Sequence, residues 1–166
     1  LAPSAFAQDA PLTRIAFGAC SHEDKNQPIW DVIREKQPQL FIHLGDAVYG
    51  DTRSPDELRA KYAKFAAKPE FRRFREAVPI LSIWDDHDYG ENDSGADYPM
   101  KEESRAIFCD FWGVPAASPR RQGQPGVFTA ETFGPEGQLV RIMLPDLRWN
   151  RSKSVSVSKN WTRYAG

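Results

Sequence analysis

A dense run of acidic and ligand-capable residues follows an apolar segment in "LSIWDDHDYGEND", residues 81–93. Asp85, Asp86, His87 and Asp88 stand next to one another directly after the apolar part. Like charges at this spacing repel each other unless water screens them or a positive charge lies among them. Two interpretations follow: a solvated, exposed turn, or carboxylates that bind metal ions.

Other apolar segments of the chain also end in residues that can act as ligands. "TRIAFGAC" ends in Cys20, "QLFIHLGD" ends in Asp46 with Tyr49 and Asp51 just beyond it, and "QLVRIMLPD" ends in Asp146. In open α/β sheets, sites form in the crevice outside the carboxyl ends of the strands. We therefore expect these strand ends to converge with the acidic run on one site.

The residue types at these strand ends indicate metal-assisted chemistry. Carboxylates suit hard cations, whereas a thiolate suits a softer or more oxidised ion. A shared Asp can bridge two ions, and such a pair can hold a phosphate ester, supply a hydroxide nucleophile and neutralise charge on the leaving side. A nearby His that is not a ligand can donate a proton to the ester oxygen. Under this hypothesis the acidic run tolerates its own charge because cations lie against it.

The elements that must position these residues alternate between strands and helices. Strands are predicted at 13–20, 39–46 and 79–84, and helices at 27–37, 54–67, 70–78 and 101–112. Ser54 is the predicted N-cap of the 54–67 helix, with Pro55 at its first position and Glu57 completing a capping box. Two later segments, "GVFTAETFG" and "QLVRIMLPD", are expected to pair antiparallel around the turn "PEG". This order predicts one α/β domain with a largely parallel sheet at its start.

The motifs "FGACSH", "LGDAVYGD", "WDDHD" and "PDLR" resemble, in this order, those of the alkaline phosphatase D (PhoD-like) metallophosphatases. The resemblance runs from about Ile15 to about Arg151. The resemblance implies a fold of two sheets packed as a sandwich and flanked by helices. It also implies an exported phosphomonoesterase or phosphodiesterase that uses iron and calcium in a binuclear or larger centre. Its substrate would be a small phosphate ester.

The resemblance also implies roles for individual residues. Cys20, Asp46 and Tyr49 would bind iron, and Asp46 would bridge to calcium. Asp86 stands where related phosphatases place a ligand Asn. As an alternative, Tyr49 is an ordinary buried aromatic residue. Its position shortly after Asp46 favours the ligand role.

Three further residues are assigned to substrate by the same resemblance. His87 would be the catalytic, substrate-facing histidine, while Asn92 and Arg148 would bind substrate or support the site. The family also has a Gly-Asp-x-His-like segment far downstream, whereas the last His here is His87. We therefore expect residues 8–166 to be the N-terminal part of the domain, incomplete at its C-terminus. The alternative hypothesis is a non-catalytic fragment or pseudoenzyme that retains partial metal binding.

Composition and charge exclude several other classes of function. The formal net charge is −1, so no global basic field favours nucleic acid. The longest apolar runs are strand-sized and too short to span a membrane. No partner protein is predicted. Residues 1–7 contain Ala5-Phe6-Ala7, which is typical of the end of a signal peptide and predicts a periplasmic or extracellular location, although an Ala-rich N-terminal tail is the alternative.

Several polar residues have structural rather than catalytic interpretations. Cys109 lies on the apolar face of the 101–112 helix and is expected in the core. Cys20 is expected to be a metal ligand and not its disulfide partner. His43 is expected to be a hydrogen-bonded core histidine, and His22 to bond the loop backbone. Asp85 is expected to cap the loop rather than to bind metal directly.

Overall fold

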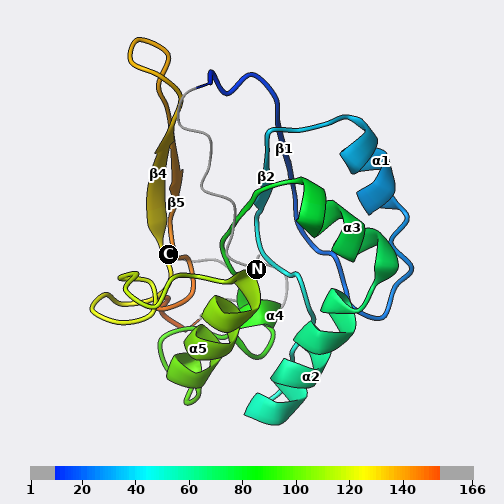
Figure 1. The fold of residues 1–166 in the computed structure, drawn as a ribbon. Coiled ribbons are helices and arrows are strands. Elements are labelled where there is room, and N and C mark those ends of the chain that lie inside the picture. Colours follow the sequence, from blue (N-terminus) through cyan, green and yellow to red (C-terminus); the bar gives the residue numbers. More distant parts are fainter. Residues whose placement is uncertain (1–9, 154–166) are drawn as a thin grey trace, which may run out of the picture.

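The computed structural model describes residues 10–153 (Figure 1). The proposed signal segment, residues 1–7, lies outside the described residues, as does the chain after residue 153. The described part contains the predicted alternation of strands and helices, with two separate sheets. No helix in this part of the chain has the length and apolar character needed to cross a membrane.

The first sheet is parallel, as predicted. Its strands are β1 (Ile15–Gly18), β2 (Leu40–His43) and β3 (Ile80–Ser82), in the order β1-β2-β3. Ile15 pairs with Leu40, and Phe41 pairs with Ile80. Every residue of the central strand β2 is buried, which is typical of a parallel sheet covered on both faces.

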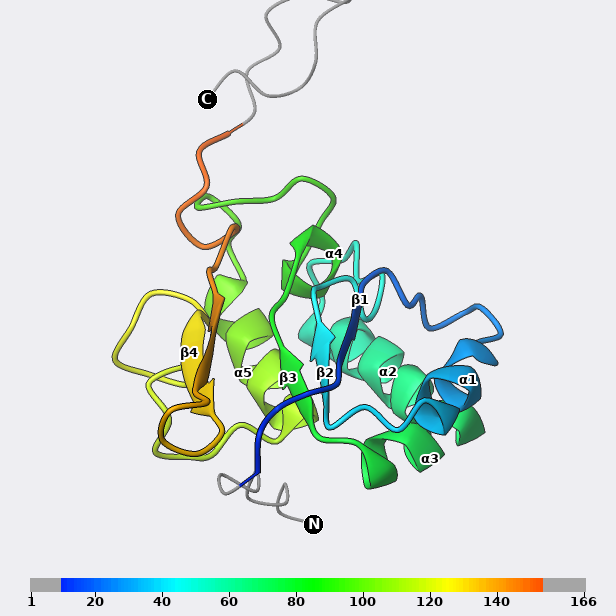
Figure 2. The ribbon, with the colours of Figure 1, turned by 90° about the horizontal axis from the view of Figure 1, so that it is seen from above.

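The helices gather along one side of these strands (Figures 1 and 2). They are α1 (Ile29–Glu35), α2 (Pro55–Ala66), α3 (Pro69–Ala77) and α5 (Lys101–Trp112). Aromatic rings fill the space between them and the sheet. The indole of Trp30 lies 5.1 Å from the rings of both Phe71 and Phe74, and Phe41 lies 5.2 Å from Phe74. Each fully buried ring of this kind stabilises the fold by about 1.5–3 kcal/mol.

The second sheet is the antiparallel pair predicted near the end of the chain. It consists of β4 (Thr129–Phe133) and β5 (Val140–Leu144), with Thr129 opposite Leu144. It stands apart from the parallel sheet as a second layer (Figure 2). The two sheets with flanking helices agree with the expected architecture.

One local prediction needs correction, and one element was not predicted. The hydroxyl of Ser54 accepts a hydrogen bond from the Glu57 amide, at 3.4 Å, but the Glu57 carboxylate accepts from the Thr52 hydroxyl instead of the Ser54 amide. The predicted capping box is therefore only half formed, because the Ser54 amide donates to the Thr52 hydroxyl instead, at 3.0 Å. The sequence also gave no sign of α4 (Asp86–Tyr89), a single helical turn inside the acidic run. Its residues are polar and too few to show a helical period.

Candidate metal centre

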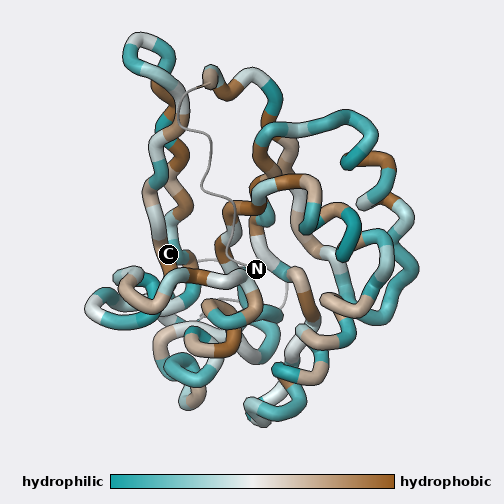
Figure 3. Tube along the Cα trace, in the orientation of Figure 1, coloured by the Kyte–Doolittle hydropathy of each residue, from teal (hydrophilic) through white to brown (hydrophobic). Residues whose placement is uncertain are grey.

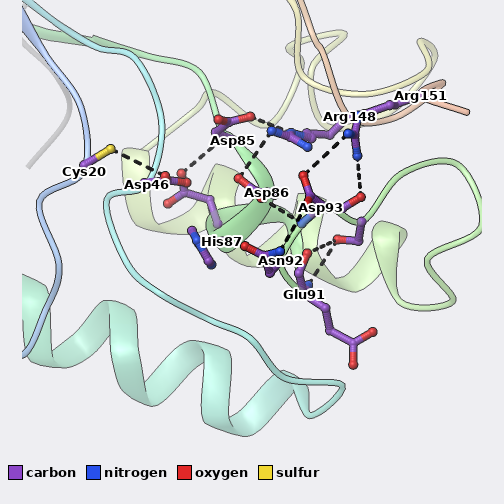
Figure 4. A network of polar contacts seen from close by, with 12 residues as sticks. Cys20, Asp46, Asp85, Asp86, His87, Glu91, Asn92, Asp93, Arg148 and Arg151 are labelled. Carbon is purple, nitrogen blue, oxygen red and sulfur yellow. Dashed lines mark hydrogen bonds and ion pairs between the residues drawn. The ribbon is translucent and has the colours of Figure 1, made fainter. Parts of the chain in front are cut away.

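The segments that follow the three parallel strands meet at one edge of the sheet (Figure 4). Cys20 follows β1, Asp46 follows β2, and Asp85 with α4 follows β3. Gly45 makes this approach possible. It adopts φ +110°, and a Cβ at this position would lie 2.6 Å from the Cβ of Asp85. The tight contact explains why a glycine precedes Asp46.

Three of the predicted site residues form a cluster with the spacing of a metal site. Ligand atoms of Asp46, Asp86 and His87 all lie within 4.8 Å of one another. The Sγ of Cys20 lies 3.6 Å from Oδ2 of Asp46, which places the thiol beside this cluster. Within residues 10–153, Oδ1 of Asp46 is buried and has no hydrogen-bond partner. A buried carboxylate oxygen without a donor fits a place for a cation.

The pKa shifts within the cluster also suit the binding of a cation. Burial raises the pKa of Asp46, and the nearby charges of Asp85 and Asp86 raise it further. Burial likewise raises the pKa of the Cys20 thiol. A hydrogen bond from Tyr49 lowers this pKa, whereas the charge and hydrogen bond of Asp46 raise it further. A bound cation reverses this effect, because it favours the deprotonated form of each ligand.

Tyr49 lies beside this cluster, between two histidine rings. Its ring centroid is 4.4 Å from that of His22 and 4.2 Å from that of His87. Burial and a hydrogen bond with the Cys20 thiol raise the pKa of the Tyr49 hydroxyl. The phenol oxygen therefore lies close to the thiol, as the proposed shared ligand role requires.

His87 is held by a residue to which the sequence assigned no specific role. Its Nδ1 lies 2.8 Å from Oδ1 of Asp51. Burial lowers the pKa of His87, but the hydrogen bond and charge of Asp51, together with Asp46 and Asp86, outweigh burial and raise it. The same Asp51 oxygen accepts the backbone N–H of Asn92, at 3.0 Å. Asn92 therefore lies next to His87 at the exposed rim of the cluster.

Arg148 enters the cluster from the chain after β5 and contacts two of its acids. Its Nε lies 2.5 Å from Oδ1 of Asp85, and its Nη2 lies 3.3 Å from Oδ1 of Asp86. The other oxygen of Asp86 accepts the backbone N–H of Asp93, at 2.8 Å. Asp85 is the N-cap residue of α4, as expected, and also pairs with Arg148. Both oxygens of Asp86 thus have protein partners, whereas Asp46 keeps a free one.

Asp146 does not join the site, contrary to the expected convergence of all four strand ends. Its carboxylate accepts the backbone N–H groups of Val127, Arg148 and Trp149 at 2.8–2.9 Å. Gly126 lets it approach this closely, since a Cβ there would lie 2.1 Å from Oδ2 of Asp146. The carboxylate of Asp146 therefore shapes the turn that carries Arg148 and is not available as a ligand.

The structure confirms the structural interpretations of the remaining polar residues. His43 is buried and its Nε2 lies 2.9 Å from the Ser21 hydroxyl, and burial lowers the pKa of His43 to about 3. His22 accepts the backbone N–H of Asp24, at 3.3 Å. Both cysteines are free, with Cys20 exposed and Cys109 buried.

Sequence reasoning missed two buried carboxylates next to the site. Asp88 is fully buried, and its Oδ1 accepts the backbone N–H groups of Ala47 and Val48. Glu23 is 1% exposed, and its Oε2 accepts the backbone N–H of Tyr49. Nothing in the local pattern separates them from solvated acids, because their partners are distant in sequence.

Comparison with known proteins shows the family and the fold of this chain. A sequence model of the family described as PhoD-like phosphatase matches residues 15–108. A solved structure described as "Structure of PhoD" superposes with a TM-score of 0.72 at 18% sequence identity. The match covers 92% of this chain and 34% of that chain, and at this identity the likeness concerns the fold alone. No curated protein matched the sequence.

Proposed function

The chain belongs to the PhoD-like phosphatase family, and we propose that it supplies the N-terminal part of a metal-dependent phosphoric ester hydrolase. The observation that carries the proposal is the buried Oδ1 of Asp46, which has no hydrogen-bond partner among residues 10–153 and lies beside Asp86 and His87. A structural carboxylate at this depth is normally hydrogen-bonded. An oxygen left open between further ligand atoms instead supports a cation site.

In this proposal, Cys20, Asp46 and Tyr49 hold iron, while Asp46 and Asp86 hold calcium. The thiol and phenol suit an oxidised transition metal, and the carboxylates suit a hard divalent ion. When bound, the ions supply the activated hydroxide and the positive charge that phosphoric ester hydrolysis needs. Asp86 already contacts Arg148 and the Asp93 amide, so it would hold calcium through an oxygen that it shares with one of these partners.

His87 is the proton donor to the leaving oxygen in the proposed reaction. Its Nδ1 is held by Asp51, which leaves Nε2 to face the substrate. Burial lowers the pKa of His87, but the hydrogen bond and charge of Asp51 raise it, which increases the fraction that carries the second proton. Asn92 at the rim and Arg148 beside Asp85 are proposed to bind the phosphate oxygens, since an amide N–H and a guanidinium both suit them.

A non-catalytic fragment that only binds metal is the second candidate. The specific observation in its favour is that the chain covers 34% of the solved PhoD chain that it resembles. The ligands named above are also few for two ions, because calcium alone takes about six to eight oxygens. Under this candidate the chain binds cations weakly and turns over no ester.

The test compares turnover of chromogenic phosphate monoesters and diesters by the full polypeptide encoded by the gene. Hydrolysis that requires metal, is abolished by chelation and is lost in Asp46→Asn would support the proposal. Asp56→Asn on α2, where the side chain is 95% exposed, is the matched control and should retain full activity. Turnover that survives thorough metal removal would contradict a metal-dependent mechanism.

A further inference from the structure

The turn that carries Asp46 and Tyr49 is held by side chains rather than by regular secondary structure. Three consecutive amides, those of Ala47, Val48 and Tyr49, donate to two buried carboxylates. Asp88 accepts the first two, at 3.0 and 3.3 Å, and Glu23 accepts the third, at 2.9 Å. The spacing between the two proposed ligands therefore depends on groups that do not themselves reach the metal cluster.

Glu23 fixes the backbone of Tyr49 together with Lys61. Lys61 Nζ donates to the carbonyl oxygen of Tyr49 at 2.5 Å and lies 3.6 Å from Oε1 of Glu23. Glu23 and Lys61 thus bind both polar groups of the Tyr49 backbone. A neutral acceptor would satisfy one buried amide without the cost of burying a charge. Glu23 is 1% exposed and Lys61 is 35% exposed, so the acid of this ion pair is buried and its placement beside Tyr49 indicates that this backbone position is closely constrained.

His22, the neighbour of Glu23, fixes the ring of the same tyrosine. The planes of the His22 and Tyr49 rings are inclined by only 22°, so the two rings stack face to face. His22, Glu23 and Asp24 also have the spacing of a possible metal group. However, Glu23 is committed to Tyr49 and Lys61, and Asp24 lies 2.5 Å from Lys64. These contacts favour a structural role over a second cation site.

We infer that Glu23 and His22 are positioning residues for Tyr49, with Glu23 holding its backbone and His22 holding its ring so that the phenol oxygen stays beside Cys20. This inference rests on the proposed function, in which Tyr49 binds iron. Groups that orient a metal ligand commonly change metal affinity by about 10- to 100-fold when removed. Both residues act through Tyr49, so they are positioning residues and not catalytic ones.

The experiment loads the purified full polypeptide encoded by the gene with ferric iron and follows the visible charge-transfer band of an iron-bound phenolate, which Tyr49→Phe identifies as that of Tyr49. Glu23→Ala should shift or abolish the band and weaken iron retention about 10- to 100-fold. Glu23→Gln, which keeps an oxygen to accept the Tyr49 amide, should retain most of the band. Ile107→Ala, a buried change in α5, is the control for lost stability alone and should retain both band and affinity.

A second readout needs no metal. In the metal-free protein, stacking on His22 displaces the NMR signals of the Tyr49 ring protons. His22→Ala and Glu23→Ala should reduce this displacement to the part that the His87 ring causes, whereas His22→Phe should preserve it. If Glu23→Ala does not fold, His22→Ala still tests the positioning of the ring, since His22 is partly exposed.

The outcomes separate the two proposals. Absence of the band in the wild-type protein would contradict iron binding by Tyr49. A band that is the same in Tyr49→Phe as in the wild type would contradict it as well. The metal-free signals would then still test the positioning roles. The inference would be overturned if the Tyr49 ring signals were unchanged in both His22→Ala and Glu23→Ala. It would also be overturned if Glu23→Ala kept the charge-transfer band and the iron affinity of the wild type.

Discussion

Arg148 lies against Asp86, with 3.3 Å between Nη2 and Oδ1, although 62 positions separate the two residues in the sequence. The same guanidinium binds Asp85, so one cation compensates two adjacent acids of the cluster. This contact ties the segment after β5 to the end of β3. It also means that the metal-free site already contains one positive charge.

Replacing Arg148 by Met should therefore destabilise the metal-free protein. A hydrogen bond to a charged group contributes about 1.5–3 kcal/mol, and the side chain of Arg148 is only 11% exposed. Urea denaturation of the chelated protein would measure the loss. Calcium should restore more stability to Arg148→Met than it adds to the wild type, because the ion can take the vacated place beside Asp86. Equal calcium effects on both proteins would refute this competition.

Asp88 should make the metal-free protein less stable as the pH rises towards neutrality. Burial raises the pKa of Asp88 to about 7, with a further contribution from Asp46, against a usual value of 3.8. Between these two values the folded state binds more protons than the unfolded state, so the free energy of unfolding falls as the pH rises. In Asp88→Asn this part of the slope should disappear. Denaturation of both proteins at several pH values from about 4 to 8 measures it; parallel curves would show that Asp88 is not the source.

The two cysteines should differ strongly in reactivity. Cys20 is exposed and Cys109 is buried, and the described structure leaves both as free thiols. A thiol reagent should label Cys20 in the native, metal-free protein and Cys109 only after denaturation. Added ferric iron should protect Cys20. Mass spectrometry that finds a Cys20–Cys109 disulfide in the unreduced protein would contradict this prediction and the proposed ligand role together.

The sequence predicted the elements well where hydrophobic periodicity was strong. The helix at 54–67 appears as α2, because its apolar residues repeat with the helical period. The strand predicted at 39–46 appears as the shorter β2, Leu40–His43, a continuous buried run. The one-turn helix α4 was missed, since four residues cannot show a period of 3.6.

The site was predictable only in part. Parallel strands bring their carboxyl ends to one edge, and this rule located Cys20, Asp46 and the acidic run correctly. It failed for Asp146, because its backbone partners arise from a tight turn that residue types do not specify. Glu23 contacts Tyr49 across 26 positions, and Asp88 contacts Ala47 across 41 positions. A local sequence pattern contains no information about contacts between residues so far apart.

Asp51 should control the protonation of His87. Its carboxylate lies 2.8 Å from Nδ1, and its hydrogen bond and charge raise the pKa of that imidazole. Asp51→Asn removes the charge, so the pKa of His87 should fall. NMR titration of the imidazole in the chelated protein gives the direction, with the exposed change Asp56→Asn as the control. An unchanged titration in Asp51→Asn would show that the acids on the other side of His87 dominate.

The 166-residue chain by itself should associate through its exposed apolar surface and hydrolyse little ester. Phe17 on β1 is 71% exposed, and it borders a groove of about 630 Å³ between β1 and α1. Apolar residues also recur along the β4–β5 pair (Figure 3), where Met143 is 70% exposed. An edge strand that carries such side chains favours pairing with other chains. Size-exclusion chromatography and binding of an apolar dye should show that residues 8–166 self-associate. Phe17→Ser should reduce this self-association without lowering the free energy of unfolding. Monomeric, cooperatively folding protein with robust metal-dependent ester hydrolysis would prove this prediction wrong.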